Sequence, residues 1–419
     1  MSVSIDQAGR ASRPPVGRLR SGLALLGPAF VAAIAYVDPG NVATNTSAGA
    51  QYGYLLVWVL VVANVMAGLV QYLSAKLGLV TGRSLPEVLR TTLRRPARLA
   101  YWAQAEVVAM ATDLAEVLGG AIALYLLFDL PLLVGGLITG LVSTGLLLVQ
   151  DRRGQRPFER VVTGLLLVIA IGFAAGLLVA PPAPGEALAG LLPAFAGSDS
   201  LLLATGMLGA TVMPHAVYLH SALARDRHGQ PAEGPARDRL LTATRFDVGT
   251  AMLLAGAVNM AMLLLAASGL RGVPGAGDDL VGVHAAIEHT LGWGVALLFA
   301  IGLLASGFAS TSVGCYAGAV VMAGLLRVRV PLLVRRLLTL LPALVVLALG
   351  VDPTWSLVLS QVVLSFGIPF ALVPLVVLTA RRDLMGSAVN HRATTVAAVL
   401  VAGAVTLLNL TLVYLTLAG

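Results

Sequence analysis

The chain has 419 residues, of which 58% are hydrophobic and only 11% are charged. Soluble globular chains are close to half apolar and a quarter charged, so this composition excludes an ordinary soluble domain. The formal net charge of +7 could suggest nucleic-acid binding, but the basic residues gather in short segments between apolar runs. That distribution is the positive-inside pattern of helical membrane proteins and argues against a nucleic-acid partner. The single cysteine, Cys315, excludes an intrachain disulfide and a multi-cysteine metal site.

Residues 1–22 contain several arginines and no apolar segment, which predicts a flexible cytoplasmic tail. The apolar run that begins near residue 23 continues without a small-residue cleavage site, which argues against a cleaved signal peptide. Residues 23–419 are predicted to form a single transmembrane domain.

Apolar runs recur along this domain, and each is close to the ~20 residues that cross the hydrocarbon core as a helix. We therefore predict an all-α polytopic membrane protein with about eleven transmembrane helices. Their approximate ranges are 23–53, 54–80, 98–127, 131–150, 158–180, 199–224, 246–270, 291–325, 331–350, 354–379 and 393–417.

The connections between these spans alternate in charge. The basic connections are those at residues 81–98, 151–160, 224–239, 327–330 together with Arg335 and Arg336, and 380–392. The intervening connections carry almost no arginine or lysine. Because short arginine-rich loops stay in the cytoplasm, we predict a cytoplasmic N-terminus and, with an odd number of helices, an external C-terminus.

Two of the predicted spans are interrupted. The first contains "DPGN" at Asp38 to Asn41, and the sixth contains "MPH" at Met213 to His215. Proline removes a backbone hydrogen bond, and unwound backbone at membrane depth survives only where it is buried in protein or lines a wet cavity. Two interruptions five spans apart indicate an inverted-repeat transporter with its site near the midplane. The repeats would cover about 23–180 and 199–379, with an extra helix at about 393–417.

The first interruption offers oxygen ligands for a cation. Asp38 supplies a carboxylate, Asn41 an amide oxygen, and the carbonyl of Ala35 or Tyr36 would be freed by the break. The alternative is that Asp38 only caps the second half-helix. We favour the cation site, because carboxylates inside membranes are costly and usually functional.

The second interruption adds a softer ligand. Met213 lies at the break, and the carbonyl of Ala210 would be freed one turn earlier. Methionine is more often a packing residue than a ligand, but a thioether beside a broken helix suits transition metals better than Mg²⁺ or Ca²⁺. Together the two breaks predict a site for Mn²⁺ or Fe²⁺.

These motifs resemble the Nramp family of proton-coupled divalent metal transporters, in its bacterial Mn²⁺ branch. The resemblance rests on "DPGN" and "MPH", with support from "QAEVVAMATDLAEVLGGAIAL" in the third span and "SQVVLSFGIPFALVPL" in the tenth. It covers essentially the whole chain beyond the tail. It implies a LeuT-type fold in the bacterial inner membrane, with no enzyme activity, resident cofactor or obligate protein partner. Its ligands for the transported metal would be Asp38, Asn41, Met213 and the Ala210 carbonyl, joined in the outward-open state by the Ala35 carbonyl and Gln361.

Three carboxylates share one stripe of the third span. Glu106, Asp113 and Glu116 follow the spacing i, i+7 and i+10, which extends over ~15 Å of helix and must face the protein interior. One interpretation is an ion-pair ladder with Arg335 and Arg336. The other is a proton relay that continues from Asp38, as the family resemblance implies for Asp113 and Glu116. The two are compatible.

Two histidines follow the second break. His215 and His220 are five residues apart, which rotates the rings ~140° around a helix, so they cannot chelate one ion as an i, i+4 pair can. His215 either tunes proton coupling or forms an interior hydrogen bond.

We therefore expect an importer of Mn²⁺, Fe²⁺ and related ions that also moves protons, with the lipid bilayer as its surroundings. The nearest rival is a Na⁺-coupled amino-acid or amine transporter of the same architecture, in which Asp38 would repel a substrate carboxylate. A rival from another class is an intramembrane metalloenzyme that uses Asp38, His215 and His220.

Overall fold

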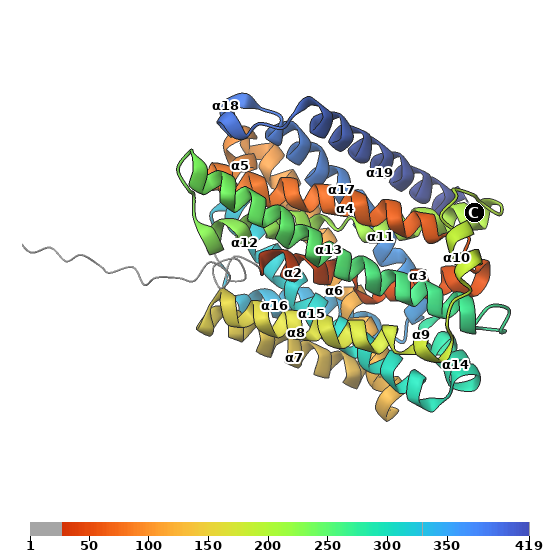
Figure 1. Ribbon diagram of the computed structural model, residues 1–419. Helices are drawn as coiled ribbons and strands as arrows, with labels where there is room; N and C mark the ends of the chain where they lie inside the picture. Colours follow the sequence, from red (N-terminus) through yellow and green to blue (C-terminus); the bar gives the residue numbers. More distant parts are fainter. Residues whose placement is uncertain (1–26, 329, 419) are drawn as a thin grey trace, which may run out of the picture.

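The computed structural model describes residues 27–328 and 330–418, and this part of the chain is helical without a strand. The predicted tail (1–22) and residues 23–26 of the first predicted span lie outside the described residues. The long helices run in roughly the same direction and form one bundle (Figure 1).

The long helices coincide with the predicted spans to within a few residues, except that α13 begins at Pro235 and not near residue 246, and α8 ends at Ala174 and not near residue 180. They are α4 (Val57–Thr81), α6 (Arg95–Phe128), α7 (Leu132–Arg153), α8 (Gln155–Ala174), α13 (Pro235–Gly269), α15 (Trp293–Leu326), α16 (Leu332–Ala348), α17 (Pro353–Thr379) and α19 (Arg392–Ala418).

Nine helical segments of the described residues are long and apolar enough to cross a membrane. The two remaining predicted spans are the broken first one and α16, which has 17 residues. The number of eleven therefore stays a prediction.

Shorter helices lie in the connections. They are α5 (Leu85–Thr92), α9 (Gly176–Val179), α10 (Pro184–Ala189), α14 (Leu280–Leu291), α18 (Arg382–Met385) and η2 (Gly386–Ala388). A capping box begins α5, in which the Ser84 amide donates to Glu87 Oε2 at 2.7 Å. Glu87 also pairs with Arg225 near the end of α12 (Pro214–His228), so this connection is tied to the second broken span.

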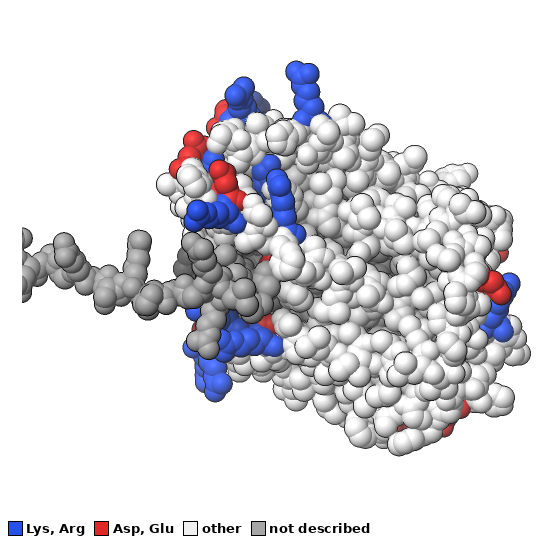
Figure 2. Space-filling model, in the orientation of Figure 1, with Lys and Arg blue, Asp and Glu red and all other residues white. Residues whose placement is uncertain are grey.

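Lysine and arginine gather at one end of the bundle, where α5, α18 and the turn between α7 and α8 lie (Figures 1 and 2). Arg335 and Arg336 do not belong to this set. Both lie in the first turns of α16 and are only 1% exposed, so counting them among the loop charges was wrong. Both arginines can be buried because carboxylates on α6 pair with them, whereas an arginine in an exposed loop is solvated by water and needs no such partner.

Both broken helices are present, but each break is shorter than predicted. The first span consists of α2 (Pro28–Ala33), η1 (Ile34–Tyr36) and α3 (Pro39–Tyr52); the second consists of α11 (Ser198–Thr211) and α12. Only Val37 and Asp38, and Val212 and Met213, are non-helical. Each proline is the first residue of its second half-helix, where the missing N–H has no partner to lose. The prediction that Pro39 to Asn41 and Pro214 to His215 would unwind was therefore wrong.

Small residues let the helices approach around these breaks. A methyl group on Gly119 of α6 would lie 2.2 Å from Pro39 Cβ, and one on Gly307 of α15 would lie 2.8 Å from the Gly120 amide nitrogen. Close backbone contact through glycine is typical of membrane helix pairs. It holds α6 and α15 against the first break.

Candidate metal centre

Asp38 is the N-cap of α3, and only one of its two carboxylate oxygens takes part in the cap. The Asn41 amide donates to Asp38 Oδ1 at 3.0 Å, so the capping role considered as an alternative is real. Oδ2 is buried and has no hydrogen-bond partner in the described part of the chain. A buried carboxylate oxygen without a partner is strongly unfavourable unless a proton or a cation meets it. Capping therefore accounts for Asp38 Oδ1 and leaves Oδ2 without a partner among the described residues.

Asn41 joins the two broken helices. Its Nδ2 donates to Asp38 Oδ1 at 2.5 Å and to the carbonyl oxygen of Ala210 at 3.1 Å. Its Oδ1 is buried and unpartnered among the described residues. The predicted ligands Asp38, Asn41 and Ala210 are thus brought together, and two side-chain oxygens among them, Asp38 Oδ2 and Asn41 Oδ1, have no hydrogen-bond partner in the described residues.

Met213 occupies the second break immediately before α12. It is fully buried and belongs to the same packed cluster as Ala35, Tyr36 and Val37, which precede Asp38. Its backbone is extended, with φ −74° and ψ 120°, which turns the chain between α11 and α12. Met213 therefore places a buried thioether at the second break, next to the Ala210–Thr211 end of α11.

The carbonyls before the first break are not equivalent. Asn259 Nδ2 donates to the Tyr36 carbonyl at 2.7 Å, and Ser306 Oγ donates to the Val37 carbonyl at 2.5 Å. Of the two carbonyls considered from the sequence, Ala35 is therefore the better candidate ligand. Sequence reasoning missed Asn259 and Ser306, although a polar side chain inside an apolar run signals such a contact.

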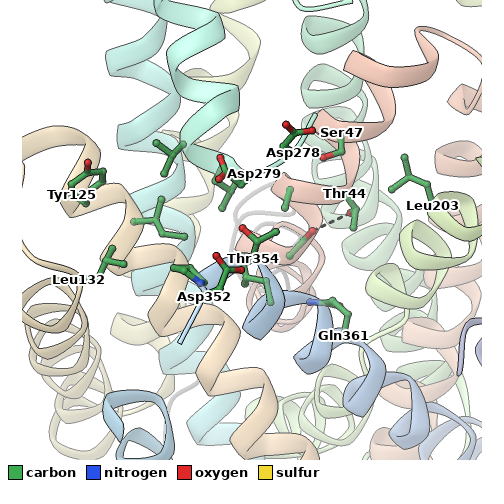
Figure 3. Close-up of a pocket in the computed structure, with 17 residues that line it drawn as sticks. Thr44, Ser47, Tyr125, Leu132, Leu203, Asp278, Asp279, Asp352, Thr354 and Gln361 are labelled. Carbon is green, nitrogen blue, oxygen red and sulfur yellow. Dashed lines mark hydrogen bonds between the residues drawn. The ribbon is translucent and has the colours of Figure 1, made fainter. Parts of the chain in front are cut away.

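Gln361 reaches the site from α17 and lines a cavity of about 420 Å³ (Figure 3). A methyl group on Gly40 would lie 2.2 Å from Gln361 Nε2 and 3.2 Å from Asp38 Oδ2, so a larger residue at position 40 would displace the Gln361 amide from this approach. Asp278, Asp279 and Asp352 line the same cavity, which lies at the end of the bundle opposite the arginines. This cavity extends to Gly40 and Gln361, which adjoin Asp38.

The predicted ion-pair ladder is present. Arg336 Nη1 binds both carboxylate oxygens of Asp113, and the Thr311 hydroxyl donates to the same carboxylate. One position earlier, Arg335 Nη2 lies 2.9 Å from Glu106 Oε1. These pairs fix α6 against α16.

Glu116 differs from the other two carboxylates. It is fully buried, and both of its oxygens lack a hydrogen-bond partner in residues 27–328 and 330–418. A methyl group on Gly314 would lie 3.0 Å from Glu116 Oε2, so this glycine makes room for the carboxyl group. Glu116 is therefore the one carboxylate of the three that forms no ion pair with an arginine among the described residues.

The two histidines have separate environments. His220 Nδ1 lies 2.8 Å from Gln71 Oε1, whereas both ring nitrogens of His215 are buried without a described partner. The described residues contain no group of three or more His, Cys, Asp or Glu that could hold a metal. This arrangement gives no support to a metalloenzyme built on His215 and His220.

A membrane-spanning helical bundle whose two broken helices meet at buried, unpartnered oxygens has the construction of a secondary transporter. The profile of the Nramp family, described as natural resistance-associated macrophage protein-like, matches residues 29–415. The chain belongs to the Nramp family.

Relatives extend over nearly the whole chain. It is 66% identical to the divalent metal cation transporter MntH of Mycobacterium tuberculosis (strain ATCC 25618 / H37Rv), over 96% of this chain and 94% of that protein. It is 47% identical to MntH of Bacillus subtilis (strain 168), over 93% and 92% of the two chains.

Solved structures agree with the predicted fold. The Eremococcus coleocola manganese transporter has a TM-score of 0.87 at 32% identity, covering 96% of this chain and 89% of that one. The nucleobase-cation-symport-1 transporter Mhp1 has a TM-score of 0.59 at 16% identity, over 93% of each chain, which concerns the fold alone. The LeuT-type fold is confirmed.

Proposed function

We propose that the protein is a secondary active importer of divalent transition-metal ions, Mn²⁺ and also Fe²⁺, driven by proton symport across the bacterial inner membrane. The observation that carries this proposal is the pair of buried, unpartnered oxygens Asp38 Oδ2 and Asn41 Oδ1 at the junction of the two broken helices. The names of the relatives, divalent metal cation transporter and manganese transporter, support the substrate class.

The metal reaches the site through the acidic cavity. Asp278, Asp279 and Asp352 attract a dication there, since like-signed groups in a cleft focus the field on an oppositely charged substrate. Next to Gly40 and Gln361, which line the cavity, Asp38, Asn41, the Ala210 carbonyl and Gln361 supply oxygens that replace water around the ion. The metal in turn neutralises a carboxylate whose burial is otherwise unfavourable.

Met213 sets the preference among metals. Carboxylate, amide and carbonyl oxygens bind hard ions such as Ca²⁺ and Mg²⁺ readily, whereas a thioether contributes to binding mainly with transition metals. With Met213 as a ligand, the site discriminates against the abundant hard ions.

Protons leave the site along α6. Asp38 is the first acceptor, and it releases its proton when the dication arrives, because metal binding requires the deprotonated ligand. Glu116 has two unpartnered oxygens and can accept that proton, while Asp113 is already bound by Arg336 and Thr311. The pathway therefore runs from Asp38 to Glu116 and Asp113, with His215 beside the site and the Glu106–Arg335 pair further along α6.

The proposed orientation places the arginine-rich end in the cytoplasm and the acidic cavity outside, and a cytoplasmic N-terminus is proposed from the sequence. It rests on the distribution of basic residues (Figure 2). A Na⁺-coupled amine or amino-acid transporter remains the rival, but the unpartnered Asp38 oxygen favours a cation over a substrate carboxylate.

The test is uptake of Mn²⁺ into proteoliposomes that contain only this protein, with the internal pH recorded at the same time. We expect an inward proton gradient to accelerate Mn²⁺ uptake, and added Mn²⁺ to acidify the interior. Uptake that required Na⁺ and ignored the proton gradient would favour the rival transporter.

A further inference from the structure

The turn between α7 and α8 forms part of a basic cavity at the arginine-rich end of the molecule. The cavity has a volume of about 430 Å³, and its lining includes Arg153, Arg156 and Arg160 from the turn and Arg227 from α12. Asp226 contributes a carboxylate to the lining, but it accepts a hydrogen bond from Arg225 Nε at 2.7 Å. Arg227 is paired with Glu159, so the excess positive charge of the lining comes from the three turn arginines.

Three of these arginines lack a matching anion. Arg153, Arg156 and Arg160 are exposed, and none forms an ion pair with a carboxylate in residues 27–328 and 330–418. Like charges that converge on one concavity repel each other, and a bound anion relieves that repulsion. The planar guanidinium group matches the oxygens of a phosphate, often with two parallel hydrogen bonds.

The surroundings of the cavity indicate where such a phosphate comes from. Apolar side chains on the outer faces of the same two helices are well exposed: Leu141 by 72%, Leu167 by 50% and Ile171 by 64%. Val161, which directly follows Arg160, is 39% exposed. The cavity thus lies where a lipid-facing apolar surface meets the basic end of the bundle, at the level of lipid headgroups.

We propose that this cavity binds the headgroup phosphate of an anionic phospholipid, from the leaflet on the arginine-rich side. The acyl chains would lie along the apolar faces of α7 and α8. This proposal is independent of the metal that the protein transports.

A lipid bound here would join two parts of the bundle. Arg227 Nη1 lies 3.3 Å from Glu159 Oε2 on α8, and Gln155 Nε2 donates to Glu159 Oε1 at 2.7 Å and to the Leu223 carbonyl of α12 at 3.1 Å. A phosphate bridging Arg227 and the turn arginines would add to this contact between α8 and α12. Bound lipid should therefore stabilise the folded protein.

The test compares two variants with the same loss of charge. The first is R153Q/R156Q/R160Q, and the control is R94Q/R95Q/R392Q, which removes three exposed arginines from other parts of the same end. Each full-length protein is titrated with phosphatidylglycerol against phosphatidylcholine, and bound lipid is counted by native mass spectrometry. Thermal stability is measured in nanodiscs of each lipid, and in phosphatidylcholine nanodiscs with millimolar inorganic phosphate.

We expect the parent and the control to retain phosphatidylglycerol and to be stabilised by it. The cavity variant should bind this lipid roughly a hundredfold more weakly, because each arginine near the membrane surface contributes about 1 kcal/mol to binding an anionic lipid. It should also lose the stabilisation by phosphatidylglycerol. If that variant does not fold, R160Q alone should show a smaller loss in the same direction. Equal losses in the control variant, or no loss in the cavity variant, would overturn the proposal. Stabilisation of the parent by inorganic phosphate to the same extent would assign the cavity to free anions and overturn the lipid assignment.

Discussion

Arg336 binds both carboxylate oxygens of Asp113 through one guanidinium nitrogen, and both side chains are almost completely buried. The pair joins α16 to α6. It also gives Asp113 two possible roles, because the carboxylate that holds Arg336 is one of the groups proposed to carry protons.

Replacing Asp113 by Asn separates these roles. The substitution leaves Arg336 buried without its counter-charge, so we expect the protein to lose about 3 kcal/mol of stability. Mn²⁺ binding should stay nearly intact because Asp113 is not a ligand, while Mn²⁺-stimulated proton influx should largely disappear. Calorimetric titration measures Mn²⁺ binding, and the internal pH of proteoliposomes measures the proton influx.

The double variant D113N/R336M is the control for that loss of stability. It removes both charges, and replacing a buried ion pair by apolar groups is often neutral or stabilising. The double variant should therefore be more stable than D113N and still lack proton influx. Parent-like proton influx in the double variant would mean that Asp113 only holds α6 to α16.

Met213→Ala tests the origin of metal selectivity. Mn²⁺ uptake should remain measurable, while excess Ca²⁺ or Mg²⁺ should compete several-fold better, since the remaining oxygen ligands suit hard ions. Met207→Ala is the matched control, because Met207 is also fully buried but lies on α11 before the break. Competition curves that do not differ between the two variants would make Met213 a packing residue.

Glu87 predicts a pH dependence of stability outside the membrane-spanning helices. Burial opposes its ionisation, but the hydrogen bond from the Ser84 amide and the charge of Arg225 outweigh burial and hold the pKa of Glu87 below its ordinary value. A carboxyl group with a lowered folded-state pKa stabilises the protein above its unfolded-state pKa, and this contribution is lost as the pH falls through the folded-state pKa.

Glu87→Gln should therefore destabilise the protein at neutral pH and make no difference in strong acid. The effect at neutral pH should be about 0.5 kcal/mol, because the pair is partly exposed and Gln can still accept from Ser84. Melting temperatures from neutral to acidic pH check this, with Glu288→Gln on α14 as a control at the other end. A constant difference at all pH values would rule out the charge as the cause.

The membrane topology can be tested with reporters. The connection around Gly229 lies among arginines, whereas the sequence around Gly185 has no arginine or lysine between Arg160 and Arg225, so the positive-inside rule predicts opposite sides. A reporter at Gly229 should be cytoplasmic and one at Gly185 external. Reporters on one side would contradict the eleven-helix topology.

The sequence was most informative where costly residues stood in apolar runs. Asp38 and Met213 beside prolines predicted both broken helices, and the structure brings Asp38, Asn41 and Ala210 into hydrogen-bond contact. The extent of the breaks was not predictable, because a proline either disrupts a helix or begins one, and the surrounding backbone decides which. Here both prolines begin helices.

Contacts between distant spans were harder to predict. Nothing in the pattern near Tyr36 indicates that Asn259 binds its carbonyl, since the two residues meet only after folding. Arg335 and Arg336 were counted among the loop charges because their carboxylate partners are distant in the sequence and meet them only after folding. A buried arginine is tolerable only beside a carboxylate, and the pairing with Asp113 and Glu106 emerges from the packing of α6 against α16.

The most direct test of the metal centre is Mn²⁺ binding to Asp38→Asn. Asparagine is as good an N-cap as aspartate, so α3 should keep its cap while the site loses its charged ligand. Isothermal titration calorimetry should show Mn²⁺ affinity falling by roughly a hundredfold or more, since even the indirect partners of metal ligands contribute up to that much. Melting temperature without metal should stay close to that of the parent. An unchanged Mn²⁺ affinity in this folded variant would contradict the proposed metal centre.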